Sequence, residues 1–172
     1  MHPAQAVRRA FVVRDVADAA DIANVRRLVT AHGDARATIP GVETVYADAA
    51  RMPGPYVAPR GGIWLAVAVA VAVTVADGEG VGCVALRPLG ARVAEVKRMF
   101  VDAEWRGRGV GRALLVALIE GARTRGYATL RLGTLDDMNA AQHLYRSLGY
   151  TPIERYRPDA LMDTQFYELS LE

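Results

Sequence analysis

Residues 106 to 112 carry the densest set of groups that could do chemistry in this 172-residue chain. The arginines are Arg106, Arg108 and Arg112, and the glycines are Gly107, Gly109 and Gly111. An apolar helical pattern follows, so the segment leads into a helix N-terminus, where backbone N–H groups are free and the helix dipole adds partial positive charge. The guanidinium groups add full charges, and positions without side chains let a phosphate approach the backbone closely. We therefore expect a polyphosphate to bind here.

Two common phosphate-binding loops do not match this segment. A nucleoside-triphosphate loop ends in Gly-Lys-Ser or Gly-Lys-Thr, whereas Gly111 is followed by Arg112 and Ala113, which excludes that class. A dinucleotide fingerprint counted from Gly107 needs glycine at the position of Arg112, and an acidic residue about 20 positions later. Neither condition is met cleanly, so a nucleotide-dependent oxidoreductase stays open only as a third interpretation.

The cysteine and the histidines offer little further chemistry. Cys83 is the only cysteine, so neither an intramolecular disulfide nor a Cys/His metal set can form, and a cytoplasmic location is expected. Its apolar, strand-like neighbours predict an inert core thiol. His2, His32 and His143 have no partners at informative spacings, so we expect surface or capping residues and no metal site.

Composition indicates a single domain, residues 1–172. The chain is 52% hydrophobic and 23% charged, which is enough for one core. The formal charge is only +2, with no block of like charges, so a nucleic-acid partner is not expected. The first ten residues lack the order of a secretion signal. The apolar run 63–76 is shorter than the roughly 18 to 20 residues of a membrane span and alternates strictly, which predicts a long buried strand and no membrane role.

The apolar patterns also predict the elements that would position the loop. Strands are expected near 11–14, 63–76, 81–86, 94–101, 127–132, 153–156 and 164–171, and helices near 18–33, 43–51, 111–125 and 139–148. Asp18 would cap the first helix and Gly33 would end it. An Asp-Gly-Glu-Gly turn makes 63–76 and 81–86 an antiparallel hairpin, whereas the intervening helix makes 94–101 and 127–132 parallel.

These elements give the fold class α/β (α+β), with one mixed sheet of six or seven strands flanked by about four helices. Any exposed part of 63–76 could pair with a second copy of the chain, so a homodimer is one expectation.

The motif Arg106-x-x-Gly109-x-Gly111 resembles the Gln/Arg-x-x-Gly-x-Gly/Ala coenzyme A loop of the GNAT (GCN5-related) N-acetyltransferases. The run Leu144-Tyr145-Arg146-Ser147-Leu148-Gly149-Tyr150 matches the family's Leu-Tyr-x-x-x-Gly-aromatic pattern at the expected distance. The resemblance covers residues 10–171. It implies a GNAT fold whose two central parallel strands splay apart, and acetyl-CoA (coenzyme A) as the cofactor.

The resemblance also implies roles for individual residues. Backbone groups of Met99, Phe100 and Val101 would pair with the pantetheine arm, and Asn139 and Tyr145 would contact the far side of the cofactor. The diphosphate would be held by Arg106, Gly107, Arg108, Gly109, Val110, Gly111 and Arg112. Glu95 occupies the place of the catalytic glutamate and would take a proton from the acceptor amine, and Tyr145 would protonate the leaving thiolate. Lys97 shares the strand face of Glu95 unless a bulge intervenes, and would lower its pKa.

The function expected from these residues is acetyl or acyl transfer from acetyl-CoA to a primary amine of a small molecule or peptide. An amine with a pKa near 10 is mostly protonated at neutral pH, which is why a base is needed. No convincing enzyme nucleophile is present, so the amine should attack directly in a ternary complex. The alternative is a non-catalytic module that only binds coenzyme A. The identity of the acceptor is left open by the sequence.

Overall fold

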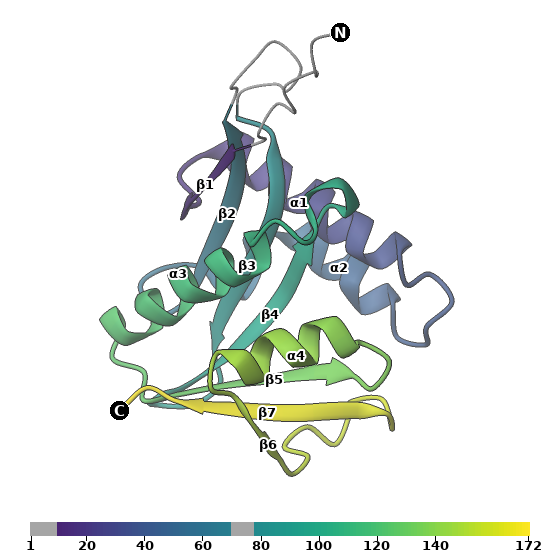
Figure 1. Cartoon of the computed structure of the whole chain (residues 1–172), viewed down its shortest axis with the longest axis vertical. Coiled ribbons are helices and arrows are strands. Elements are labelled where there is room, and N and C mark those ends of the chain that lie inside the picture. Colours follow the sequence, from purple (N-terminus) through teal and green to yellow (C-terminus); the bar gives the residue numbers. More distant parts are fainter. Residues whose placement is uncertain (1–9, 70–77) are drawn as a thin grey trace, which may run out of the picture.

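The computed structural model describes residues 10–69 and 78–172 (Figure 1). Within them the strands are β1 (Ala10–Asp15), β2 (Gly62–Val69), β3 (Gly80–Pro88), β4 (Val93–Val101), β5 (Thr129–Leu135), β6 (Thr151–Ile153) and β7 (Thr164–Ser170). The α-helices are α1 (Ala19–Asp34), α2 (Glu43–Arg51), α3 (Val110–Thr124) and α4 (Asn139–Ser147), with 3-10 helices η1 (Gly54–Tyr56) and η2 (Ala103–Trp105). The predicted element order is confirmed. Residues 70–76 of the expected long strand lie outside the described part.

All strands join one sheet in the order β1-β2-β3-β4-β5-β7-β6. The hairpin of β2 and β3 is antiparallel, and β4 and β5 are parallel, as predicted. Every other neighbouring pair in the described sheet is antiparallel. The mixed sheet of the predicted fold class is therefore confirmed, and its one parallel pair lies at the centre.

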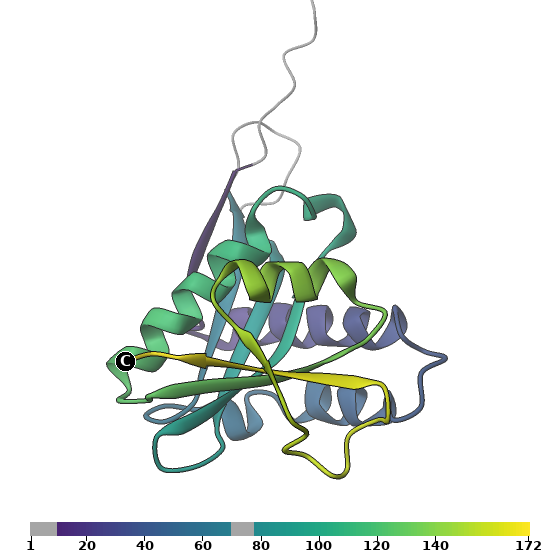
Figure 2. The same cartoon turned by 60° about the horizontal axis from the view of Figure 1, so that its bottom comes forward.

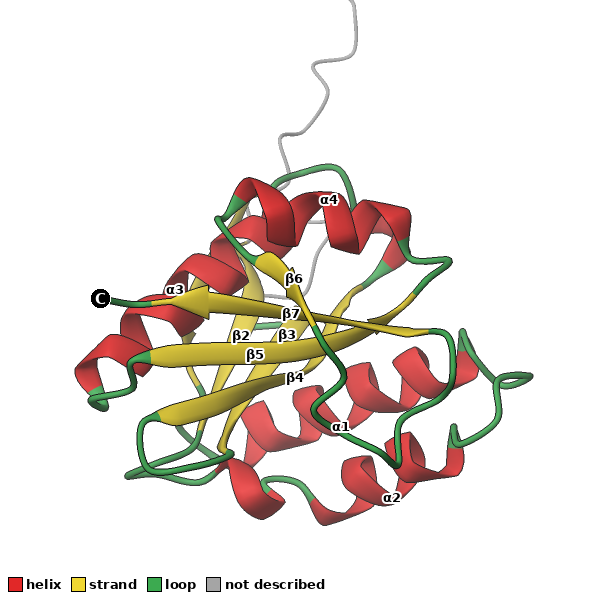
Figure 3. Ribbon diagram, turned by 90° about the horizontal axis from the view of Figure 1, so that it is seen from below, coloured by secondary structure: helices red, strands yellow, loops and turns green. Residues whose placement is uncertain are grey.

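Helices α1 and α2 cover one face of the sheet, and α3 and α4 cover the other (Figure 3). Strand β2 contributes to both cores because its buried side chains alternate. Trp64, Ala66 and Ala68 pack with α3, whereas Ile63, Leu65 and Val67 pack with α1 and α2. The alternation in the sequence thus predicted correctly a strand buried on both faces over this stretch.

Helix α1 begins as the sequence predicts but ends differently. The Asp18 carboxylate accepts a hydrogen bond of 2.9 Å from the backbone N–H of Asp21, which caps the helix. The helix continues through Gly33 to Asp34, so the expectation that Gly33 ends it was wrong. A side chain at Gly33 would lie 2.6 Å from the ring of Tyr46. The glycine is therefore needed where α1 packs against α2.

The two central strands separate after a short paired start. Parallel pairing joins only Val93–Glu95 of β4 to Thr129–Arg131 of β5, and the strands then diverge (Figures 1 and 2). The register of β4 against β3 shifts between Lys97 and Phe100, and Arg98 in this bulge has a φ of 54°. Beyond Glu95, β4 has no strand partner on the β5 side among the described residues. This confirms the splayed strands that the family resemblance implied.

No helix in the described ranges, 10–69 and 78–172, is long and apolar enough to cross a membrane.

Candidate active site

The loop before α3 has the geometry of an anion site. Gly107 and Gly109 have φ angles of 69° and 83°, in the left-handed region that glycine tolerates best. Gly109 is the N-cap of α3, and no side chain of the described residues caps this helix. A Cβ added at either glycine would meet no atom within 4 Å, so open space lies beside both positions. The first amides of α3 are therefore available to a ligand.

The three arginines of this loop are exposed and are each held by a neighbouring oxygen. Arg106 Nε donates to the carbonyl of Val101 at 3.0 Å, and its guanidinium lies over the ring of Phe100. Arg108 Nε donates to the carbonyl of Glu104 at 3.0 Å. Arg112 Nη1 lies 3.2 Å from Ser147 Oγ on α4. Positive charge thus surrounds the uncapped helix end.

Gly111 places this loop next to the splayed strand. A side chain there would lie 2.9 Å from Met99 Cε and 3.3 Å from Leu144 Cδ2. The N-terminus of α3 therefore packs tightly against both β4 and α4. As a result, the amides of the loop, the free edge of β4 and the Leu144 side of α4 border the same gap in the sheet.

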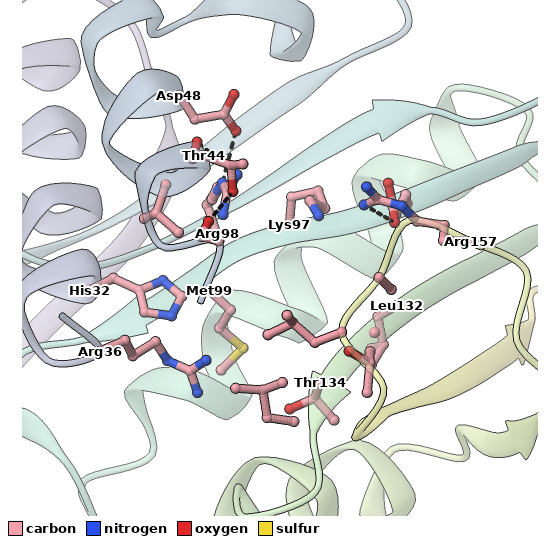
Figure 4. A pocket seen from close by; sticks show the side chains of 18 of the residues that line it. His32, Arg36, Thr44, Asp48, Lys97, Arg98, Met99, Leu132, Thr134 and Arg157 are labelled. Carbon is pink, nitrogen blue, oxygen red and sulfur yellow. Dashed lines mark hydrogen bonds and ion pairs between the residues drawn. The ribbon is translucent and has the colours of Figure 1, made fainter. Parts of the chain in front are cut away.

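A cavity of about 460 Å³ opens where β4 and β5 part (Figure 4). Residues from both faces of the sheet line it, including His32 of α1 and Tyr145 of α4. Glu95, Lys97 and Met99 come from β4. Further lining comes from the α1–α2 connection, which carries Arg36, and from α2, β3, β5 and the loop after β6. The cavity therefore runs through the sheet at the splay.

Glu95 lies in this cavity with both carboxylate oxygens occupied. Its side chain is 1% exposed. Oε2 accepts from Arg87, at 2.6 Å from Nη2 and 2.8 Å from Nε, and Oε1 accepts from the Tyr156 hydroxyl at 2.9 Å. Arg157 Nη1 lies 3.4 Å from Oε1. Burial alone would raise the pKa of Glu95, but Lys97, Arg87 and these hydrogen bonds outweigh it and hold the pKa below its usual value.

Lys97 shares the strand face of Glu95, because the bulge of β4 begins only after it. The pKa of Lys97 is lowered to about 8, mainly by burial and also by the guanidinium groups of Arg98, Arg157 and Arg87, while Glu95 opposes them. The ammonium is therefore still largely protonated at neutral pH. Lys97 lowers the pKa of Glu95, as predicted.

Arg98 is held in its unusual backbone conformation by α2. Its Nε lies 2.8 Å from Asp48 Oδ2, which also accepts from the Tyr56 hydroxyl at 2.5 Å. The Asp48 pKa would be raised by burial, but these two hydrogen bonds lower it overall. An ion pair to a helix on one face thus anchors the residue that forms the bulge of β4 against β3.

Tyr145 points from α4 toward the same gap. Its side chain is 7% exposed, and its hydroxyl lies 3.8 Å from Met99 Sδ. Burial raises its pKa to about 12, so the phenol keeps its proton at neutral pH. The ring packs against Tyr150 and Tyr167, which fixes its direction.

His32 was expected at the surface or as a cap, and this prediction was wrong. The ring is mostly buried, lines the cavity and stacks on Phe100 at 5.6 Å between centroids. Its Nδ1 has no hydrogen-bond partner among the described residues. Burial, followed by the charges of Arg36 and Arg98, lowers its pKa to about 4. His143 is exposed as expected, and His2 lies outside the described residues.

The structure brings most of the predicted residues to one place. Glu95, Met99 and Tyr145 line the cavity, and the 106–112 loop borders the gap beside it. Asn139 begins α4, is exposed and does not line the cavity. Cys83 is buried as predicted, and no metal-binding cluster occurs in the described part of the chain. Sequence reasoning missed Arg36, Arg157 and the buried setting of His32, since only tertiary packing brings them to β4.

Comparison with known proteins relates the chain to one family. The family model described as "Acetyltransferase (GNAT) domain" matches residues 61–152, more than half of the chain. An uncharacterized N-acetyltransferase of Schizosaccharomyces pombe is 33% identical over 95 residues, which cover 55% of this chain and 58% of that protein. N-acetylaspartate synthetase of Danio rerio is 34% identical over 108 residues, 62% of this chain and 36% of that protein. The matches thus span less than two thirds of either relative.

A solved structure shares the architecture. An acetyltransferase of the GNAT family from Staphylococcus aureus MU50 superimposes with a TM-score of 0.77. The match covers 95% of this chain and all of that one, at 22% sequence identity. Similarity at this level of identity supports the shared fold but gives no information about the substrate.

Proposed function

The chain belongs to the GNAT acetyltransferase family, and on that premise we propose that it is an N-acetyltransferase that moves an acetyl group from acetyl-CoA to a primary amine. One observation carries the proposal: an uncapped, glycine-rich and arginine-flanked helix start borders the gap through which a single cavity crosses the sheet. The zebrafish relative is named an N-acetylaspartate synthetase, so amino acids belong to the acceptor classes considered.

The residues present fit coenzyme A. The free amides before α3, with open space beside Gly107 and Gly109, suit a diphosphate, and the charges of Arg106, Arg108 and Arg112 complement it. The free edge of β4 at Met99, Phe100 and Val101 suits the amide groups of a pantetheine arm. Val110, Gly111, Asn139 and Tyr145 would complete the contacts. Bound there, the cofactor supplies an acetyl thioester, a carbonyl activated toward an amine.

Two side chains are proposed to move protons. The amine nitrogen forms a bond to the acetyl carbon as the carbon–sulfur bond breaks, the amine loses a proton to Glu95, and the Tyr145 hydroxyl donates a proton to the departing sulfur. Because both oxygens of Glu95 are occupied, it can accept the proton only when acceptor binding displaces Tyr156 or Arg157 from Oε1. The proton of the amine can also pass to Glu95 through a water molecule.

The alternative function, a module that binds coenzyme A without turnover, has one observation in its favour. Glu95 is neutralised by Arg87 and Arg157 and has a lowered pKa, which makes it a weak base in this arrangement. Thiol release from acetyl-CoA across a panel of primary amines separates the two functions. Turnover with at least one amine supports the transferase, whereas tight binding with no turnover on any amine supports the module.

Glu95→Gln tests the proposed base. The amide keeps an oxygen that can accept from Arg87, so the local packing is retained, but it cannot take a proton. We expect kcat to fall by about 100-fold or more with unchanged acetyl-CoA affinity. Activity close to that of the parent would mean that Glu95 only positions its arginines.

The proposal also includes a cytoplasmic location and a homodimer. A single buried free thiol, Cys83, suits a reducing cytoplasm. The homodimer expected through 63–76 finds no free edge in the described part of that strand, because β2 pairs with both β1 and β3. Strand β1 is the edge of the described sheet and exposes Val12, so a homodimer through β1 is the proposal that light scattering would test.

A further inference from the structure

The cavity carries more positive than negative charge. Its cationic side chains are Arg36, Arg51, Arg87, Lys97, Arg98 and Arg157, and its carboxylates are Asp48, Glu95 and Asp159. His32 adds no charge at neutral pH, because its pKa is lowered to about 4. An acceptor that enters this space therefore meets an excess of cations.

The carboxylates are already committed to arginines. Glu95 is bound by Arg87 and Arg157, and Asp159 lies 2.8 Å from Arg157 Nη2. Asp48 is bound by Arg98, with Arg51 at 3.6 Å. No carboxylate of the cavity in the described residues is left to hold an incoming ammonium group. A polyamine would thus have to displace an arginine from one of these carboxylates to gain an anionic partner.

Lys97 and Arg36 are cationic side chains of the cavity that are not committed to a carboxylate. Neither has a carboxylate within ion-pair distance among the described residues, and both side chains extend into the cavity, Lys97 from β4 and Arg36 from the segment after α1 (Figure 4). Arg36 Nη2 lies against the thioether of Met138. Glu95 acts on Lys97, and Asp137 on Arg36, only from beyond ion-pair distance. Partly buried cations without a direct ion pair are costly, and an anionic ligand would relieve that cost.

We propose that the acceptor is an amine that also carries carboxylate groups, held by Lys97 and Arg36, and in the first place a dicarboxylic amino acid. The inference rests on the proposed function, because it names the substrate of that site. The same positive charge lowers the pKa of the acceptor's ammonium group and so increases the fraction that is free to attack. One arrangement of charge thereby selects the acceptor and eases its deprotonation.

Matched acceptors test the charge preference directly. L-Aspartate is compared with L-asparagine and L-glutamate with L-glutamine, since each pair differs by one carboxylate, and putrescine serves as the cationic amine. We expect kcat/KM to be at least tenfold higher for the acid than for its amide, and lowest for putrescine. Equal rates within the pairs, or faster turnover of putrescine, would overturn the inference while leaving the N-acetyltransferase in place.

Charge-removing variants locate the site. Lys97→Met and Arg36→Met should each lower kcat/KM for the acidic acceptors by about 10- to 100-fold, mainly through KM, with the KM for acetyl-CoA unchanged. Lys97→Arg, which keeps the charge, should retain most activity. Arg51→Met is the control from the same cavity, because Arg51 is 72% exposed and already near Asp48. An equal loss in the control would contradict a specific role for Lys97 and Arg36.

A binding measurement keeps the inference independent of turnover. Succinate offers two carboxylates and no amine, so its calorimetric affinity reports the cationic site alone. Binding by the parent that is lost in Lys97→Met supports the inference even if every amine fails as an acceptor, a result that would refute only the proposed function. Absence of succinate binding to a folded parent that binds acetyl-CoA would refute the inference.

Discussion

The two residues proposed for proton transfer are shifted in opposite directions by their surroundings. Tyr145 is buried among aromatic rings, which raises its pKa to about 12 and keeps it a donor. Glu95 is also buried, but the positive charge around it more than compensates, so its pKa is lowered and it remains ionised. Burial thus strengthens the usual preference of the phenol for its proton, whereas nearby charge preserves the usual ionisation of the carboxylate.

Tyr145→Phe should reduce kcat by about 100-fold or more, because the leaving sulfur loses its proton donor. The ring that packs against Tyr150 and Tyr167 is retained, so the unfolding midpoint in urea should change little. Tyr127→Phe is the control, since its hydroxyl binds the Arg60 carbonyl away from the cavity. Unchanged kcat in Tyr145→Phe would remove this residue from the mechanism.

His32 should make the protein less stable in mild acid. Its pKa is about 4 in the fold against a usual 6.5, so the unfolded chain binds the proton more tightly. Stability is therefore lost as pH falls from 6.5 toward 4, by about 2 kcal/mol at pH 5. His32→Phe keeps a ring against Phe100 and removes the titration. Urea unfolding at pH 8 and pH 5 should show a smaller difference in this variant, and an identical difference would contradict the assignment.

At the residue scale, the sequence predicted correctly those features that depend on residues close together in the chain. The loop glycines, the buried Cys83 and the position of Tyr145 follow from spacing and hydrophobic periodicity, or from the family resemblance. The partners of Glu95 could not be predicted, because Arg87 comes from β3 while Tyr156 and Arg157 come from the loop after β6. Arg87 lies 8 positions from Glu95 on the paired strand, but Tyr156 and Arg157 lie 61 and 62 positions away. Contacts at that separation leave no trace in local spacing.

At the scale of elements, the loop before α3 matters through its backbone. Gly109→Ala places a Cβ on a residue with a φ of 83°, at a cost of about 1 to 2 kcal/mol, and should tilt the free amides away from the ligand. Gly126→Ala imposes the same strain at the other end of α3, where φ is 80° and no atom lies within 4 Å. Both variants should lose similar stability in urea, but only Gly109→Ala should lose calorimetric affinity for acetyl-CoA. Equal affinities would argue against the loop as the diphosphate site.

The elements themselves were predicted well, and the exceptions have a tertiary cause. Helix α2 spans the predicted 43–51, and α4 differs from its prediction by one residue. Gly33 lies inside α1, where its role is packing: Tyr46 of α2 occupies the space that a side chain at this position would take. The bulge at Arg98 is fixed by Asp48, so it could not be read from the sequence of β4 alone.

At the scale of the whole molecule, the two proposed ligands approach from different faces of the sheet. The 106–112 loop belongs to the side of α3 and α4, whereas His32 of α1 and Arg36, just after α1, line the cavity from the side of α1 and α2 (Figures 3 and 4). They can meet only at the gap between β4 and β5, next to Met99 and Tyr145. Such an arrangement lets both ligands be bound at once, which direct transfer requires.

Initial rates measured over a grid of acetyl-CoA and acceptor concentrations should give intersecting double-reciprocal lines. A ping-pong pattern needs an enzyme nucleophile, and Cys83, the only thiol of the chain, is buried at 1% exposure with its pKa raised by burial to about 12. Cys83→Ala should therefore keep kcat within about twofold, since it removes only a packed sulfur. Parallel lines, together with an acetylated protein detected by mass spectrometry in the absence of acceptor, would show instead that the acetyl group passes through the enzyme.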